Sequence, residues 1–256
     1  MSVRRLLSLL VGALLLTALA GTSSKASAGG AACGVDVAGN GGYTYAGHQA
    51  VDSAHGVGAT ITQVRAPEVA AGHVAGWVGV GGPGQGVNGT DEWIQVGLAS
   101  VAGTAPFLYA EVTRPGRAPS FQLVEQDVPL GASRRVAVLE MSGRPNWWRI
   151  WVDGNPVTNP ILLRGSSLRW APIATAESWN GGHGACNRFS FRFEHVSVSR
   201  SPGGSWLAFK PGYKFLDSGY SVRTLAGGTS NEKLRTLSGA GAGAAPAPYA
   251  FLASSS

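Results

Sequence analysis

Charged residues, cysteine and methionine are all scarce in this chain of 256 residues. Asp, Glu, Lys and Arg together make up 13% of it, and there are only two cysteines and two methionines. Two cysteines are too few for a fold that depends on a disulfide scaffold. No dense cluster of Lys and Arg with interleaved aromatic residues is present, so a nucleic-acid partner is not expected.

Long apolar runs are missing except near the N-terminus. The run Leu6 to Ala20 follows Arg4 and Arg5 and precedes a small-residue site at 26–28. It is too short for a comfortable membrane span, and this order of segments predicts a secretory signal peptide over residues 1–28. We therefore expect cleavage near Ala28 and a secreted mature protein of about 228 residues with no membrane partner.

Maturation also lowers the net charge. The full chain carries 20 basic and 14 acidic side chains, a formal net charge of +6. Removing Arg4, Arg5 and Lys25 leaves 17 basic and 14 acidic side chains, a net charge of +3. A charge this small gives little support to an anionic partner.

No amphipathic helix of useful length appears. Instead, short alternating segments recur at roughly ten-residue spacing, with Gly, Pro and Asn clusters between them, which predicts an all-β sandwich or barrel. The expected strands cover residues 58–64, 74–80, 92–98, 107–113, 120–126, 135–141, 147–152, 168–179 and 188–199.

The composition also suggests how the chain is divided. After the signal peptide, residues 29–56 are rich in Gly and Ala, and we expect a loose arm with at most one strand near Tyr43 to Tyr45. The β-sandwich domain is predicted over residues 57–200, and a C-terminal extension over 201–238 with a possible hairpin. Residues 239–256 are Gly/Ala/Pro-rich, which predicts a disordered tail.

Common catalytic motifs are missing as well. There is no Gly-x-Ser-x-Gly, no His-Glu-x-x-His and no Gly-rich loop leading into a helix. A nucleophile-elbow hydrolase, a metal site and a bound cofactor are therefore not expected. In an oxidising compartment the two cysteines, Cys33 and Cys186, are expected to form one disulfide bond.

Two neighbouring strands place polar and aromatic side chains opposite the core. In residues 93–98, Ile94, Val96 and Leu98 alternate with Trp93, Gln95 and Gly97. In residues 107–113, Tyr109 and Glu111 likewise lie on the non-core face. By itself this pattern also fits an ordinary solvated face of a sheet.

Four short motifs in a shared order resemble one known family. They are Trp77-Val78-Gly79-Val80, Ile94-Gln95-Val96-Gly97, Tyr109-Ala110-Glu111 and Ala176-Glu177-Ser178-Trp179. Glu111 lies 16 residues after Gln95, and Glu177 lies 82 residues after it. From about Gly58 to Ser199 the chain is similar to the glutamic peptidases, or eqolisins. Each motif is short, so their order and spacing carry the resemblance.

The resemblance implies a concanavalin A-like β-sandwich of two curved antiparallel sheets and a secreted, acid-acting endopeptidase. Glu177 would activate water, Gln95 would stabilise the oxyanion and Glu111 would support the site. The protein is then expected to be a monomer that needs no cofactor. An extended polypeptide would lie in an aromatic groove lined by Trp77, Trp93, Tyr109, Trp147, Trp151 and Trp179.

The chain also departs from the family pattern at two places. Gly81 stands where an acidic residue usually follows the Trp-Val-Gly-Ile element, and Trp179 comes two residues after Glu177 rather than directly after it. These departures favour an alternative, a non-catalytic sandwich that binds polysaccharide or peptide through its aromatic face. A third possibility is a glycosidase that uses Glu111 and Glu177 as its carboxyl pair.

Overall fold

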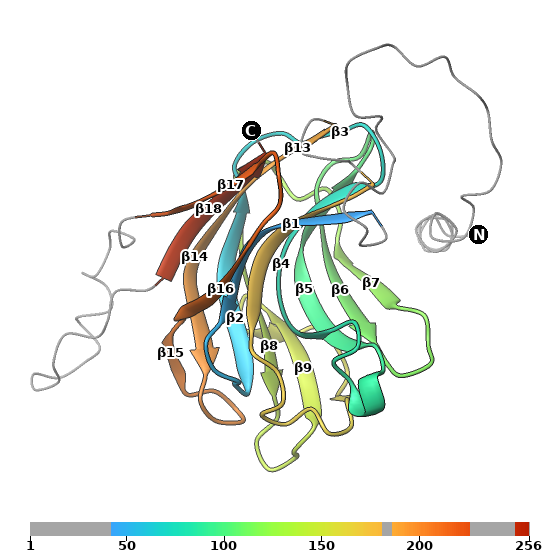
Figure 1. Cartoon of the computed structure of the whole chain (residues 1–256), viewed down its shortest axis with the longest axis vertical. Coiled ribbons are helices and arrows are strands. Elements are labelled where there is room, and N and C mark those ends of the chain that lie inside the picture. Colours follow the sequence, from blue (N-terminus) through green and yellow to red (C-terminus); the bar gives the residue numbers. More distant parts are fainter. Residues whose placement is uncertain (1–41, 181–185, 226–248, 256) are drawn as a thin grey trace, which may run out of the picture.

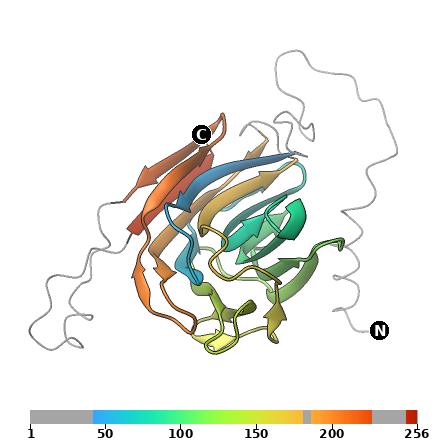
Figure 2. The same ribbon diagram turned by 60° about the horizontal axis from the view of Figure 1, so that its bottom comes forward.

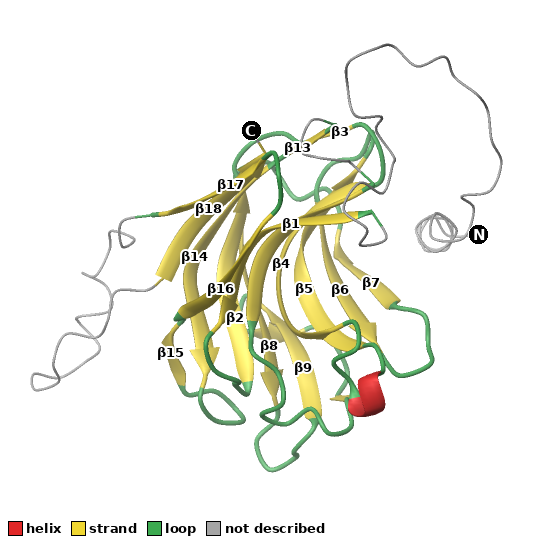
Figure 3. Cartoon of the chain, in the orientation of Figure 1, coloured by secondary structure: helices red, strands yellow, loops and turns green. Residues whose placement is uncertain are grey.

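The computed structural model of the chain describes residues 42–180, 186–225 and 249–255, which form two packed antiparallel β-sheets (Figure 1). Within these residues, the helical structure is a single short turn, η1 (Val87–Gly89), as the colouring of Figure 3 shows. The expectation of an all-β sandwich is confirmed. No helix in these ranges is long and apolar enough to cross a membrane.

The seven-stranded sheet carries most of the residues singled out above. Its strand order is β16 (Pro211–Leu216), β1 (Tyr43–Ala50), β12 (Ile173–Trp179), β4 (His73–Gly82), β5 (Glu92–Val101), β6 (Phe107–Thr113) and β7 (Ser120–Glu125). Each neighbouring pair is antiparallel. We call the side of this sheet that is turned away from the other sheet the outer face.

The second sheet covers the opposite side of the core. Its main path is β10 (Asn155–Pro156), β9 (Trp147–Val152), β8 (Ser133–Glu140), β2 (Gly56–Gln63), β14 (Ser190–Ser199), β18 (Tyr249–Ser255) and β17 (Tyr220–Thr224). Two short strands extend it, β11 (Ile161–Leu162) beside β9 and β15 (Trp206–Ala208) beside β14. A separate two-stranded ribbon joins β3 (Glu68–Val69) and β13 (Asn187–Arg188).

The core lies between the two sheets and follows the two-residue period of the strands. Ile94, Val96 and Leu98 of β5 point into it and are fully buried. Phe191 and Phe193 of β14 meet them from the other sheet within one continuous cluster. Because alternate residues must then point outward, this packing fixes which side chains of the seven-stranded sheet form the outer face.

The domain boundaries differ from those expected from composition. The strand expected near Tyr43 to Tyr45 within the loose arm is β1, but it extends to Ala50 and pairs with β12. The expected C-terminal extension supplies β15, β16 and β17, and the end of the expected disordered tail is β18, between β14 and β17. Figure 2 shows the red C-terminal strands next to the blue β1, so both ends of the described chain complete the sandwich.

The boundary errors have a physical reason. Segments such as Tyr249–Ser255 are too short to show their strand character above the surrounding Gly, Ala and Pro. Their hydrogen-bond partners lie far away in sequence, as for Phe251 and Phe193. The strand expected over 168–179 begins only at Ile173, directly after Pro172. The predicted signal peptide and Cys33 fall outside the described residues, so the signal peptide and the disulfide bond stay predictions.

Candidate functional site

The register of four strands brings the candidate residues onto one face. Thr175, Trp77, Gly97 and Tyr109 stand opposite one another across β12, β4, β5 and β6. Glu177 lies two residues to one side of this row on β12. Gln95 and Glu111 are register partners two residues to its other side, on β5 and β6.

Gly97, the member of this row on β5, has no side chain. A Cβ on Gly97 would lie 2.1 Å from the carbonyl oxygen of Gly76 and 2.6 Å from the Cβ of Trp77. The position therefore accepts only glycine, and β4 and β5 lie close together there. Glu177 and Gln95 flank this point from two strands that are separated by β4.

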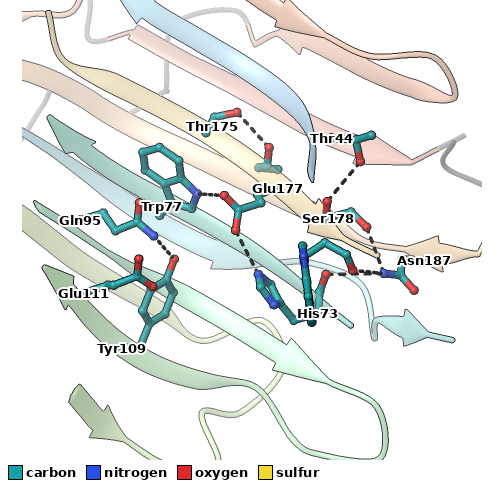
Figure 4. A network of polar contacts seen from close by, with 12 residues as sticks. Thr44, His73, Trp77, Gln95, Tyr109, Glu111, Thr175, Glu177, Ser178 and Asn187 are labelled. Carbon is teal, nitrogen blue, oxygen red and sulfur yellow. Dashed lines mark hydrogen bonds and ion pairs between the residues drawn. The ribbon is translucent and has the colours of Figure 1, made fainter. Parts of the chain in front are cut away.

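Glu177 is a buried carboxylate whose two oxygens each meet a nitrogen from β4. The indole Nε1 of Trp77 donates to Oε2 at 3.1 Å, and Nε2 of His73 lies 3.0 Å from Oε1 (Figure 4). Only 6% of Glu177 is exposed. His73 and Trp77 can hold one carboxylate between them because residues four apart on a strand point to the same face.

Gln95 is also buried and is held from the next strand. Its Nε2 donates a hydrogen bond of 3.1 Å to the hydroxyl of Tyr109, as Figure 4 shows. The ring of Tyr109 stacks on Phe121, with centroids 5.5 Å apart. Burial raises the pKa of Tyr109 well above its ordinary value, and the negative charge of Glu177 adds to this. Tyr109 is therefore a neutral hydroxyl over the whole physiological pH range.

Glu111 stands directly opposite Gln95 in the register. Burial raises its pKa to about 7, against the effect of a hydrogen bond from the indole of Trp93, and the nearby charge of Glu177 raises it further. That bond, from Nε1 to Oε1, is 2.9 Å long. In acidic medium the outer face therefore holds one neutral carboxylic acid, Glu111, and one carboxyl group, Glu177, that accepts hydrogen bonds from two sides.

Aromatic rings extend from Glu177 toward the edge of the sheet. Tyr45 is the register partner of Glu177 on β1, and its ring lies 6.1 Å from that of Phe215 on β16. Tyr43 stacks on Tyr45 at 6.3 Å, and Trp179 stacks on His73 at 5.6 Å. Burial first, and then the charge of Glu177, raises the pKa values of Tyr43 and Tyr45.

The two-sheet architecture is similar to that of solved glutamic peptidases. A crystal structure of scytalido-glutamic peptidase with a transition-state analogue inhibitor matches with a TM-score of 0.50. The match covers 83% of this chain and 97% of that one, at 14% sequence identity. The fold is that of a glutamic peptidase. The resemblance found in the sequence is thus confirmed at the level of the fold.

Two further structures give similar coverage. Scytalido-glutamic peptidase with a peptide-based transition-state analogue matches over 84% of this chain with a TM-score of 0.47 and 13% identity. SCP-B, an eqolisin in complex with the tripeptide Ala-Ile-His, matches over 84% with a TM-score of 0.44 and 13% identity. Each of these two matches covers 98% of the solved chain. No protein-family model and no curated protein sequence matches this chain.

Within the glutamic-peptidase fold, most of the expected groove residues lie on the outer face. Four of them alternate with core residues on the neighbouring strands β4, β5, β6 and β12: Trp77, Trp93, Tyr109 and Trp179. The expectation was wrong for Trp147 and Trp151. Both belong to β9 of the other sheet, where β9 pairs with β8 and β11. The resemblance placed them in the groove, and nothing in the sequence shows which sheet their strand joins.

Gly81, the first departure from the family pattern, has a backbone explanation. Its φ is +85°, and a Cβ there would lie 2.3 Å from the carbonyl oxygen of Glu92. The end of β4 thus turns in a way that an acidic residue could not adopt without strain. A carboxyl side chain at position 81 is therefore incompatible with this backbone.

Sequence reasoning missed His73, Tyr43, Tyr45 and Phe215. His73 could have been found, because it precedes Trp77 by four residues and so shares its face. The other three come from segments that composition marked as loose or peripheral. No group of three or more metal-ligating side chains occurs among the residues that the structure describes.

Proposed function

We propose that this chain is a secreted endopeptidase of glutamic type that works in acidic medium. The observation that carries the proposal is the outer-face arrangement of Glu177 and Gln95. A carboxyl group held by nitrogen atoms of His73 and Trp77 and an amide held by Tyr109 lie on either side of Gly97. Export rests on the basic, apolar and small-residue segments of residues 1–28.

The proposed reaction needs no covalent intermediate. Glu177 takes a proton from a water molecule, and the water oxygen attacks the carbonyl carbon of the scissile peptide bond. The carbonyl π electrons move to oxygen, and an N–H of Gln95 donates to the resulting oxyanion. The proton then passes from Glu177 to the leaving nitrogen, the C–N bond breaks, and the carboxylate is restored.

The groups around Glu177 and Gln95 are compatible with catalysis in acidic medium. Because burial raises the pKa of Glu111 to about 7, this carboxyl group is protonated below neutral pH. It then adds no second negative charge beside the developing oxyanion. Gln95 and Tyr109 do not titrate in this range, so the oxyanion donor keeps its hydrogen bond throughout.

The test is digestion of casein or haemoglobin at pH 2 to 5 by the wild-type protein and three variants. Glu177→Gln should abolish cleavage, and Gln95→Ala should lower kcat by about 10²–10³. Gln49→Ala is the matched control, because Gln49 lies on the outer face of β1, opposite Ile173 and away from Glu177. The proposal fails if the wild type does not cleave, or if Gln95→Ala and Gln49→Ala behave alike.

One observation favours the non-catalytic alternative. Both oxygens of Glu177 and the amide nitrogen of Gln95 already have partners within the protein. The rings of Tyr43, Tyr45 and Phe215 meanwhile provide stacking surfaces that suit a sugar or an aromatic side chain. Calorimetric titration with cello-oligosaccharides and with a casein peptide separates the two. Binding of either without cleavage at any pH from 2 to 8 supports the alternative.

A further inference from the structure

His73 is the one titratable nitrogen base in contact with Glu177 among the described residues. Its Nε2 lies 3.0 Å from Oε1 of the carboxylate. The His73 side chain is 27% exposed and that of Glu177 is 8% exposed. The imidazole therefore lies between the buried carboxyl group and solvent.

The position of the imidazole is fixed by its surroundings. One face stacks on Trp179, with centroids 5.6 Å apart at 30°, and Tyr43 approaches edge-on at 6.3 Å. The preceding Gly72 has a φ of +64°, and a Cβ there would lie 2.0 Å from the carbonyl oxygen of Trp179. The turn before β4 is therefore pressed against the end of β12.

A buried asparagine, Asn187, forms hydrogen bonds with the same turn. Asn187 is fully buried, and its side chain bridges the turn to β12. Its Nδ2 donates to the carbonyl of Ala71 at 2.8 Å and to Oγ of Ser178 at 3.0 Å, and its Oδ1 accepts from the amide of Ala70 at 2.9 Å. The backbone and ring of His73 are thus held in place by packing and hydrogen bonds, unlike those of a freely rotating surface histidine.

We infer that His73 is a positioning residue that fixes the orientation of the Glu177 carboxyl group. This inference rests on the proposed function. Nε2 of His73 lies 3.0 Å from Oε1 while Nε1 of Trp77 lies 3.1 Å from Oε2, so the carboxyl group is held at both oxygens. Without His73, Oε1 loses this partner, and the group can turn out of the orientation that proton transfer needs.

The activity test compares kcat and KM in four proteins. His73→Leu should lower kcat by about tenfold to a hundredfold with little change in KM, because Oε1 loses its partner. His73→Gln keeps a hydrogen-bond donor and should restore most of this loss. His195→Gln is the control, since His195 is exposed on β14 of the other sheet, and its kcat should match the wild type.

A second measurement does not depend on activity. In nitrogen-15 NMR spectra of the full chain, the Nε2–H of His73 should give a hydrogen-bonded, slowly exchanging signal that Glu177→Leu removes, because leucine has no acceptor. If that signal is absent or unaffected by Glu177→Leu, the pairing is wrong whether or not the protein cleaves peptides. If the wild type cleaves and His73→Leu has the same kcat, the inference fails while the proposed function stands. If the wild type does not cleave, both fail.

Discussion

At the residue scale, the carboxyl group of Glu111 makes folding stability depend on pH. Its pKa in the folded protein is about 7, because burial disfavours the charged form. An unfolded glutamate titrates near 4.3. Between these values the folded state binds more protons than the unfolded state, so stability is lost as pH rises through this window. Below about pH 4 both states are protonated, and the residue makes no difference.

We therefore predict that Glu111→Gln is more stable than the wild type at pH 8 by up to about 3 kcal/mol, and equal to it at pH 4. Urea unfolding of both proteins at the two pH values measures this. Glu68→Gln is the control, because the Glu68 side chain is 62% exposed and should show no such pH-dependent difference. A constant difference between Glu111→Gln and the wild type at both pH values would contradict the argument.

A residue-scale reading of the sequence recovered much of the site. Strand alternation was sufficient to put Gln95 and Glu111 on the face opposite Ile94 and Val96, because side-chain direction follows the two-residue period. It did not show that Gln95 is buried, with only 8% of the residue exposed. Burial on the outer face depends on rings such as Phe121, and their positions follow from the sheet order.

At the element scale, the turn at the end of β4 constrains what the site can contain. Gly81 has a φ of +85° and no room for a Cβ beside the carbonyl of Glu92. We predict that Gly81→Asp, which would supply the acidic residue typical of the family, destabilises the fold by more than about 2 kcal/mol. Thermal unfolding monitored by circular dichroism measures it.

Gly116 provides the matched control for this prediction. It has a φ of +67°, but a Cβ there would have no atom within 4 Å. Gly116→Asp should therefore cost only the backbone preference, about 1 kcal/mol. If both variants cost the same, the steric part of the argument is wrong and the positive φ alone explains the glycine.

A second element-scale feature is a buried carboxylate at the end of β8. Glu140 is 0% exposed and accepts hydrogen bonds from the amide of Asn146 and the hydroxyl of Ser167, and it pairs with the imidazole of His55. It thereby ties β8 to three separate loops. We predict that Glu140→Ala lowers stability by about 3–5 kcal/mol, because buried donors lose their acceptor.

Urea unfolding followed by tryptophan fluorescence tests this prediction. Glu125→Ala is the control, because Glu125 pairs with Arg134 at a site where the two side chains are 37% and 19% exposed. Water can replace that interaction, so the expected loss is at most about 1 kcal/mol. Similar losses in both variants would show that Glu140 does not connect the loops as described.

At the scale of the whole molecule, sequence reasoning found the middle of the sandwich and missed its ends. The strands between residues 58 and 199 are predicted by alternating apolar residues and by the turn residues between them. The pairing of β1, β16 and β18 is not visible in the sequence, because their partners lie far away in the chain, such as Ala46 opposite Leu216. The aromatic part of the outer face depends on these strands, which is why Tyr45 and Phe215 were not anticipated.

The C-terminal strand offers the sharpest test of this closed architecture. Phe251 of β18 is fully buried and stacks on Phe193 of β14, with centroids 4.5 Å apart. Leu252, its neighbour in sequence, points to the opposite side and is only partly buried. We predict that Phe251→Ala destabilises the protein by about 3–5 kcal/mol, while Leu252→Ala costs clearly less.

Equilibrium urea unfolding gives both free energies from one experiment. If residues 249–255 were a dispensable tail, truncating either side chain would change stability by no more than about 0.5 kcal/mol. A large loss for Phe251→Ala alone requires that the last strand fills the common core. The outer face depends on that core, because inward packing of alternate residues is what turns Glu177 and Gln95 outward. The end of the chain and the candidate site are therefore coupled through a single packed interior.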